Sequence, residues 1–365
     1  MNFIAKKDQI VEAIQNAAAV AERKNTIPIL ANMLITIVGK KAAFSATDLE
    51  IQIKTIAEVK EVKEEGEITV SAKKMSELCR SLPDNEEINF FLNLGKLSIR
   101  AKSFKADLST ISASDFPEID CKEVLSATKV PPDLIRNILQ KTHFSMASQD
   151  VRYYLNGLLI EVKEGVISAV ATDGHRLAIS RNNLKDVNDF SSIVPRKAVL
   201  ELLKILQSAN DEVELVLGSN FLSLNSDIFK FSSKLIDGKF PDYKKVFPEG
   251  APESLRILRE NLLSALSRAS VLSNEKYRGV RLSLSENALK LSANNPEQES
   301  AEEDLEATYS GESFEIGFNI GYLVEALNSI DTKEAEISFY GEDSSCTINS
   351  TNEDDSLYVI MPMRL

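Results

Sequence analysis

Apolar residues recur at helical spacing in three segments that begin 124 positions apart. The segments are Ser71–Leu82, Pro195–Leu206 and Asn319–Ile330. In the second of them, Val199 and Leu202 belong to an apolar set spaced three or four residues apart, which places the set on one helix face. The pattern therefore predicts three equivalent helices, one in each third of the chain.

Other elements recur in the same order around these helices. A first amphipathic helix is expected at Ile10–Ala21, Leu134–Phe144 and Leu255–Leu272. A short apolar strand follows at Ile29–Val38, Tyr154–Val162 and Val280–Leu284. Alternating apolar and polar positions predict further strands around Leu49–Ile53, Ile167–Ile179 and Leu289–Ala293. After the second helix come strands within Ile88–Ile111, Val213–Leu235 and Ala335–Met361.

This repeated order predicts an α+β fold of three similar domains, each with two helices packed on antiparallel sheets. The period is too long for a solenoid repeat and fits three homologous domains. Proline, glycine and polar residues cluster near Asp120–Ala127 and Pro248–Pro252. We therefore expect domains at residues 1–121, 127–247 and 248–365.

Composition excludes several classes of protein. Of the 365 residues, 43% are hydrophobic and 27% charged, which is typical of globular domains. Cys79, Cys121 and Cys346 are far apart, so neither a disulfide framework nor a zinc site is expected, and a reducing cytoplasm is the predicted location. No apolar run is long enough for a membrane span, and the first residues lack a signal-peptide core.

The net charge of −13 taken alone argues against a nucleic-acid partner, but its distribution changes that interpretation. Residues 246–365 carry 9 basic and 22 acidic groups, whereas residues 121–245 carry 17 and 15. The acidic excess therefore lies in the last third, with many of its residues in Glu297–Glu306 and Glu342–Asp355. The first two thirds are nearly balanced, so basic surfaces are possible there.

Basic residues recur on one face of the second helix in two of the three repeats. Lys73 and Arg80 are seven residues apart, and so are the matching Lys197 and Lys204. Such a face is either simply solvated or contacts a phosphate backbone without reading sequence. Recurrence at equivalent positions favours phosphate contact more than either helix would alone.

Three short segments carry unusual side chains. The run Gln149–Gly157 places Arg152 and two tyrosines before a strand, where they contact phosphate, sugar or unpaired bases, or else seal a sheet edge. In Ala171–Ala178, Asp-Gly between apolar strands predicts a hairpin with His175 just after the turn. The chain ends Met361-Pro-Met-Arg-Leu365, which is either adaptable binding surface or a frayed core strand.

No catalytic or cofactor-binding constellation accompanies these segments. The only other histidine is His143, and no ligand cluster surrounds either one. A triad using Asp173 and His175 fails because the two are too close in sequence, and there is no nucleophile elbow. Neither G-x-G-x-x-G nor G-x-x-x-x-G-K-[ST] occurs. The sequence predicts no enzyme, no metal and no cofactor.

Together these segments resemble the bacterial DNA sliding clamps, the beta subunits of DNA polymerase III. The resemblance spans the full length and rests on the three repeats, on Gln149–Gly157, on Thr172–Arg176 and on Met361–Leu365. Further matching strings are Phe240–Tyr243, Leu272–Lys276 and Asn294–Gln298. The family implies a head-to-tail homodimer forming a six-domain ring around duplex DNA. That ring is non-catalytic, slides without sequence specificity, is opened by an ATP-dependent loader and tethers the polymerase.

The resemblance also implies roles for individual residues. A pocket between domains two and three would take short peptide motifs from the replicative polymerase alpha subunit, the clamp loader, other polymerases and repair proteins. Its residues would be Leu155, Thr172, Gly174, His175, Arg176, Leu177, Pro241, Val246, Asn319, Tyr322, Ser345, Val359, Met361, Pro362, Met363 and Arg364. DNA contacts would come from Lys24, Lys73, Arg80, Gln149, Arg152, Tyr153, Tyr154, Arg196 and Lys197. Dimer contacts would join Lys74, Lys105 and Leu108 of one subunit to Val271, Leu272, Glu297, Glu299 and Glu303 of the other.

Three positions depart from the family pattern, and two other functions compete with the leading one. Lys24 and Lys245 replace arginines seen in some members, which exchanges bidentate phosphate geometry for a point charge. Ala106 stands where family members can carry a large aromatic at the dimer contact, and Phe104 faces the same side of its strand. A ring-less scaffold that binds peptides of replication or repair proteins would appear as a monomer that still binds polymerase peptides. A hydrolase using His175 would show turnover that disappears in His175→Ala.

Overall fold

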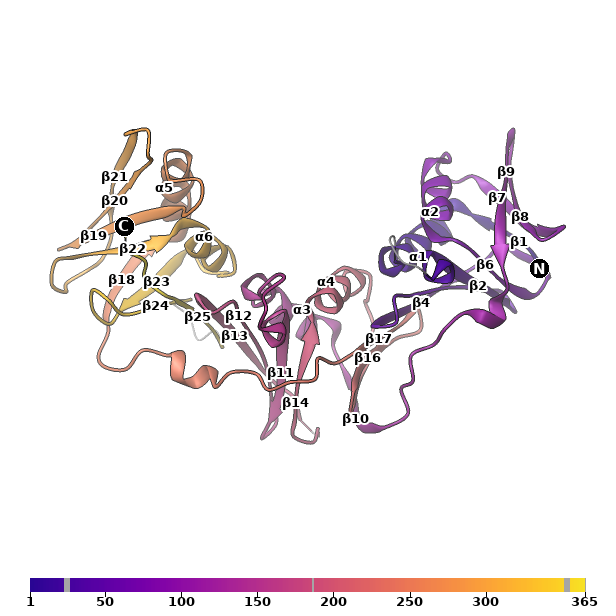
Figure 1. Cartoon of the computed structure of the whole chain (residues 1–365), viewed down its shortest axis with the longest axis horizontal. Coiled ribbons are helices and arrows are strands. Elements are labelled where there is room, and N and C mark those ends of the chain that lie inside the picture. The colour runs from indigo at the N-terminus through magenta and orange to yellow at the C-terminus, as the bar shows by residue number, and fades with distance from the viewer. Residues whose placement is uncertain (23–26, 186, 351–354, 365) are drawn as a thin grey trace. The chain divides into compact units, whose positions relative to one another are not determined.

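The computed structural model describes residues 1–22, 27–185, 187–350 and 355–364. The chain divides into two compact units, which are described separately. Unit 1 comprises Met1–Arg136 and Lys197–Leu235, and unit 2 comprises Asn137–Arg196 and Ile236–Leu365. Both units combine helices with antiparallel sheets, as the α+β prediction required (Figure 1).

Unit 1 is built on one sheet of thirteen strands. Their order is β10-β15-β16-β17-β4-β3-β2-β6-β9-β8-β7-β1-β5. The bounds are β1 Asn2–Lys6, β2 Asn32–Val38, β3 Lys41–Thr47, β4 Ile51–Glu58, β5 Glu61–Glu64, β6 Gly66–Ser71, β7 Glu87–Asn93, β8 Lys96–Ala101, β9 Phe104–Ile111, β10 Val124–Val130, β15 Val213–Gly218, β16 Phe221–Asn225 and β17 Phe229–Lys234. Helix α1 (Lys7–Val20) packs on α2 (Ala72–Ser81) and against β3 and β4, while α4 (Arg196–Ile205) follows β14.

Unit 2 contains two sheets. The eight-stranded sheet has the order β14-β11-β12-β13-β25-β24-β23-β18, and the four-stranded sheet β21-β20-β19-β22. The bounds are β11 Gly157–Lys163, β12 Val166–Thr172, β13 Arg176–Asn183, β14 Phe190–Pro195, β18 Glu253–Leu258, β19 Gly279–Ser285, β20 Ala288–Asn294, β21 Ser300–Glu306, β22 Phe314–Asn319, β23 Glu334–Phe339, β24 Cys346–Ser350 and β25 Ser356–Ile360. Its helices are α3 (Pro132–Gln140, shared with unit 1), α5 (Arg259–Val271) and α6 (Ile320–Asn328).

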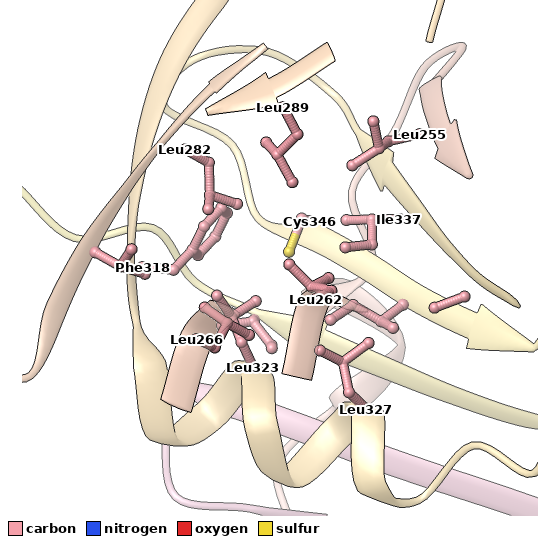
Figure 2. Close-up of a cluster of buried hydrophobic side chains, with 14 of the residues drawn as sticks. Leu255, Leu262, Leu266, Leu282, Leu289, Phe318, Leu323, Leu327, Ile337 and Cys346 are labelled. Carbon is pink, nitrogen blue, oxygen red and sulfur yellow. The ribbon is translucent and has the colours of Figure 1, made fainter. Parts of the chain in front are cut away.

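The core of unit 2 shows how the helical spacing is used. Leu262 and Leu266 of α5 meet Leu323 and Leu327 of α6, and strand side chains such as Phe318 close the cluster (Figure 2). All of these side chains are almost completely buried. Because residues four apart lie on one helix face, each helix presents an unbroken apolar stripe to the sheets.

The three predicted second helices are present as α2, α4 and α6, each starting one residue inside the expected segment. The first helix of the last third was predicted to begin too early. Leu255 and Ile257 are buried while Arg256 and Leu258 are exposed, a period of two, and this stretch forms β18 paired with β23. Helix α5 therefore begins at Arg259.

Leu49 was predicted to share a strand face with Ile51 and Ile53, and this was wrong. Leu49 lies in the turn before β4 with φ +76°, and its side chain is 37% exposed. The turn is held by Thr47 and Asp48, whose side-chain oxygens accept the backbone N–H groups of the following residues. The predicted alternation begins only at Ile51, where the ladder with β3 is established.

The same turn recurs one repeat later. Thr172 Oγ1 accepts from Gly174 N, and Asp173 Oδ1 accepts from the N–H groups of His175 and Arg176. In both turns the threonine hydroxyl also donates to the carbonyl of the first strand residue. The shared turn shows that β4 and β13 are equivalent strands of successive repeats. Each pairs antiparallel with a strand of the repeat after its own: β4 with β17, and β13 with β25.

Candidate functional site

The hairpin between β12 and β13 matches the Asp-Gly prediction. Gly174 adopts φ +89°, a conformation that favours glycine, and a Cβ there would lie 3.1 Å from the guanidinium of Arg152. Thr172 is buried and His175 is exposed. The turn therefore brings the candidate residues of Gln149–Gly157 and Thr172–Arg176 together in unit 2.

Arg176 is the most constrained residue of this turn. Its side chain donates to Asp173 Oδ2 (3.1 Å), to Glu325 of α6 and to the backbone carbonyl of Phe144. Its guanidinium also lies over the rings of Phe144 (5.4 Å) and Tyr322 (4.4 Å), which are favourable cation–π positions. Because the residue is only 9% exposed, it acts as a buried connection between the β12–β13 turn and α6.

An apolar cluster lies beside this turn and contains several predicted pocket residues. Leu177 of β13 and Val359 of β25 are buried cross-strand partners in it. Val246 packs on the cluster from the 3-10 turn Tyr243–Val246, which lies between β17 and β18 in the chain. Leu155 is buried in the 3-10 turn Tyr153–Leu155, just before β11. Pro241, on the same segment as Val246, is exposed.

The C-terminal segment leaves the sheet after β25, as Pro362 predicted. Met361 N donates to His175 O (2.9 Å) and Met363 N donates to Gly317 O (2.9 Å), so the segment lies between the turn and β22. Met361 is exposed, and Met363 and Arg364 line two cavities of about 670 and 400 Å³. Neither of those cavities includes Leu155, Leu177 or Val359 among its lining residues, so the buried cluster and the tail are separate parts of the predicted pocket.

Three further predicted pocket residues lie in the last third of the chain. Asn319 begins α6, accepting from Tyr322 N and donating to Tyr277 O (3.1 Å). Tyr322 joins the turn through its stacking on Arg176, and burial raises the pKa of its hydroxyl. Ser345 is half-buried directly before β24.

The basic residues predicted to contact DNA differ in their exposure and in their ion-pair partners. Lys73 and Arg80 are exposed on α2, opposite the buried Met75 and Cys79, as the helical spacing predicted. Lys197 is instead half-buried and pairs with Asp48, a residue of the β3–β4 turn. Both side chains of the first pair are exposed, although Lys73 lies 3.9 Å from Glu77 in a solvated ion pair, whereas Lys197 would have to leave a half-buried one.

The remaining DNA candidates in unit 2 include exposed aromatic surface. Tyr153 is 57% exposed and lies edge-on to Tyr154, with 5.8 Å between ring centroids. Gln149 is exposed with φ +58°, and Arg196 donates to Met146 O (2.9 Å). Lys24 lies outside the described residues.

Arg152 is held by Asp150, a partner that the sequence analysis did not identify. Its Nε and Nη2 donate to the two carboxylate oxygens of Asp150 at 3.0 and 2.8 Å. The side-chain hydrogen bond from Arg152 lowers the pKa of Asp150 to about 2. An aspartate two residues before an arginine in a loop is the only local signal for this pair.

We expect the Asp150 pKa to return towards its ordinary value in Arg152→Gln. A depressed pKa in the folded state means that the pair stabilises the fold above the unfolded pKa of about 4 and that this contribution is lost as pH falls towards 2. Carboxyl-carbon NMR titration of both proteins measures the shift. An Asp150 midpoint near 4 in the unsubstituted protein would contradict the assignment.

Three of the eight predicted dimer residues, Lys105, Leu108 and Glu303, lie on two strands that each have an open edge. Strand β9 pairs with β8 along its length, but with β6 only at Ile111 and Thr110, so one edge is open over residues 104–109. Strand β21 is the outer strand of its sheet and pairs only with β20 among the described strands. Lys105 is exposed on β9, while Leu108 is buried.

The other predicted dimer residues surround β21 or belong to α2. Val271, at the end of α5, is 77% exposed, and Leu272 after it is half-buried. Glu303 of β21 forms an ion pair with Arg268, which holds the pKa of that carboxyl below its usual range. The exposed residues that complete the set are Lys74, Glu297 and Glu299.

Neither a metal site nor a membrane span is seen in the described part of the chain. No group of three or more histidine, cysteine, aspartate or glutamate side chains is positioned to hold a metal ion there. No helix among those residues combines the length and apolarity needed to cross a bilayer.

Three family models match the chain in succession and together cover almost all of it. They describe the N-terminal, central and C-terminal domains of the DNA polymerase III beta subunit, and they match residues 1–120, 129–242 and 244–364. The order of the matches follows the threefold repeat.

Curated relatives and solved structures agree with these matches. The chain is 41% identical over 367 residues to the beta sliding clamp of Pseudomonas aeruginosa and 38% identical over 366 residues to that of Escherichia coli, with all of both chains covered in each case. A crystal structure of the Pseudomonas aeruginosa sliding clamp bound to griselimycin superposes with a TM-score of 0.95 at 40% identity over the full length of both chains. The Caulobacter crescentus beta subunit gives 0.92 at 33% identity, again over both complete chains.

Proposed function

The chain belongs to the DNA polymerase III beta subunit family, and on that premise we propose that two copies close head to tail into a ring around duplex DNA. The protein is a polymerase processivity factor and not an enzyme. It binds DNA, the polymerase and other partners.

The observation that carries the ring proposal is the pairing of homologous strands. Within the chain, β4 pairs with β17 and β13 pairs with β25. By position in the repeat, β21 corresponds to β4 and β13, and β9 corresponds to β17 and β25. Both β9 and β21 have an open edge, so pairing β21 of one copy with β9 of a second copy repeats the same contact a third time. Such a contact is heterologous and closes after two copies if the rotation permits.

Charge supports the same pairing. Strand β21 and the turn before it carry Glu297, Glu299 and Glu303. Strand β9 carries the exposed Lys105, and its one acid, Asp107, is paired with Arg100 of β8. Complementary charge across an edge-to-edge contact fixes register and disfavours pairing of β21 with itself. The exposed Val271 supplies apolar area next to this edge.

We further propose that DNA is contacted by α2 and by the Gln149–Tyr154 segment. The exposed side chains of Lys73 and Arg80, with the exposed ring of Tyr153, support this assignment. Lys24, Arg196 and Lys197 remain part of the proposal. Contacts of this kind are sequence-independent, which suits a ring that must slide.

The double substitution Lys73→Gln/Arg80→Gln is expected to weaken DNA binding uniformly across sequences. Each phosphate contact contributes about 0.9 to the slope of log K against log salt concentration, so the slope should decrease in magnitude by about 1.8. Fluorescence anisotropy with a labelled duplex across a salt series measures it. Lys63→Gln/Lys96→Gln, which removes two exposed lysines from strand regions, serves as the charge-matched control. An unchanged slope in the first variant would remove α2 from the DNA surface.

Partner peptides are proposed to bind where the Leu177–Val359 cluster meets the C-terminal segment. The cluster supplies apolar side chains, and Met361 with Met363 supplies adaptable surface beside it. Arg176 has its donors occupied by Asp173, Glu325 and Phe144, so we assign it to shaping the pocket.

Two further proposals concern organisation and location. We propose three domains at residues 1–121, 127–247 and 248–365, supported by the threefold repeat of strand pairing. Strand β10 begins inside the expected first linker, because residues 124–130 pair with β15. We also propose a cytoplasmic location, which suits a replication protein whose cysteines are unpaired.

A further inference from the structure

Unit 1 contains a cavity of about 450 Å³ at the junction of β4 and β17. Its wall includes Gln52 and Lys54 of β4, Lys230 and Ser232 of β17, and Cys121 from the segment before β10. The volume lies within the range of ordinary ligand pockets. None of these residues belongs to the DNA, partner or dimer surfaces proposed above.

The cavity occupies the repeat-equivalent position of the proposed partner pocket in unit 2. The β4–β17 and β13–β25 ladders align through their shared turns. In this alignment the cross-strand pair Gln52–Ser232 corresponds to Leu177–Val359. An apolar pair at the centre of the partner pocket is thus replaced by an amide and a hydroxyl.

The next cross-strand pair on the same face differs more strongly between the two units. Lys54 lies directly opposite Lys230, where the equivalent pair in unit 2 is Ile179–Leu357. Like charges directly opposite each other on a sheet are destabilising without a counter-charge. In the part of the chain that the structure describes, neither ammonium has a carboxylate within ion-pair distance, and Glu118 is the one acid in the cavity wall.

We propose that this cavity is a second docking site, specific for an extended acidic peptide segment. A carboxylate placed between Lys54 and Lys230 would relieve their repulsion, and the hydroxyls of Ser223 and Ser232 beside them suit a polar chain. This goes beyond the proposed function, because the site needs neither ring closure nor the apolar pocket.

The surrounding charge favours a peptide over a nucleic acid. Glu118 lines the cavity, and the exposed Asp120 and Glu123 follow it in the same segment. An extended peptide can place carboxylates towards the two lysines and its intervening neutral residues towards Glu118, whereas a phosphate backbone carries a charge at every unit and meets repulsion there.

Cys121 provides a direct reporter of occupancy. Cys79 and Cys346 are buried, so native alkylation should modify Cys121, which is only partly buried. The test measures the rate of Cys121 modification by iodoacetamide, by mass spectrometry, with a capped eight-residue peptide of alternating glutamate and serine. We expect saturable protection by this peptide and none by the same peptide with glutamine in place of glutamate.

The variant Lys54→Gln/Lys230→Gln should bind the acidic peptide about tenfold more weakly, because two charge contacts are lost. Lys40→Gln/Lys41→Gln, which removes two exposed lysines outside the cavity, should bind as the unsubstituted protein does. Absence of saturable protection would overturn the proposal, as would equal binding by the Lys54/Lys230 variant. Equal protection by an oligonucleotide of the same charge would overturn it in favour of a phosphate-binding surface. Because apolar-peptide binding and dimer mass are measured separately, failure here leaves the proposed function standing.

Discussion

Replacing Val271 and Leu272 together with alanine is expected to convert the dimer into monomers. Val271 is largely exposed at the end of α5, next to the acidic β21 edge, so an intersubunit contact would bury it. Truncating two interface aliphatic side chains typically costs about 2–4 kcal/mol, equivalent to a ~30- to 1,000-fold weaker association. Light scattering coupled to size-exclusion chromatography at micromolar concentration measures the mass.

A matched pair elsewhere separates interface loss from general destabilisation. Val124 and Leu125 are also adjacent, aliphatic and about half exposed, at the start of β10. Val124→Ala/Leu125→Ala should remain dimeric, and both variants should keep the circular dichroism of the unsubstituted protein. A dimer of normal mass in the Val271/Leu272 variant would place the interface elsewhere.

Arg176→Ala is expected to give the largest loss of stability in unit 2. Removal of the guanidinium leaves Asp173, Glu325 and the Phe144 carbonyl without their partner. Breaking a buried ion pair costs about 3–5 kcal/mol, and because Glu325 is partly exposed we expect the lower end, about 3 kcal/mol. Urea unfolding followed by circular dichroism measures the change.

Arg176→Ala should also weaken binding of apolar partner peptides, because the turn that carries Leu177 loses its connection to α6. Arg181→Ala, an exposed position on the same strand, should change stability by no more than about 0.5 kcal/mol. Arg176→Lys restores the charge but not the fork geometry, so only partial recovery is expected. Normal stability of Arg176→Ala would show that the Glu325 connection is dispensable.

The sequence predicted best where one face of an element is buried along its whole length. The starts of α2, α4 and α6 were located to one residue and their ends to one or two, because their apolar spacing has no competing period. At Leu255–Leu258 the apolar residues are compatible with an earlier start of the following helix. The segment is a strand because it pairs with β23, and this pairing is not visible in the local sequence. Strand β3 was not predicted at all, since residues 42–47 are buried on both faces and show no alternation.

The sequence predicted which residues belong to the candidate sites, but it did not predict which other residues they contact. The Asp-Gly turn could be predicted from two residues, whereas the partner of Arg176 on α6 is 149 residues away. For the same reason the sequence placed Lys197 with the free cations, although Asp48, 149 residues earlier, holds it in an ion pair. Long-range ion pairs leave no periodic signal in a single sequence.

The placement of charge also explains why a net charge of −13 is compatible with DNA binding. Acidic residues concentrate on and around β21, an edge that we assign to the subunit contact, while Lys73 and Arg80 stay exposed on α2. Pairing of this acidic edge with β9, which carries the exposed Lys105, places part of the acidic excess at the subunit contact. The helix surface that we assign to DNA is left basic.

The most direct test of the ring is retention on circular DNA. The protein is loaded onto nicked circular duplex by a clamp loader, the complex is separated from free protein by gel filtration, and the DNA is then linearised. A topological link predicts that the protein stays with the circle at high salt and is released when the circle is cut. Release from the intact circle, or equal retention before and after linearisation, would contradict encirclement.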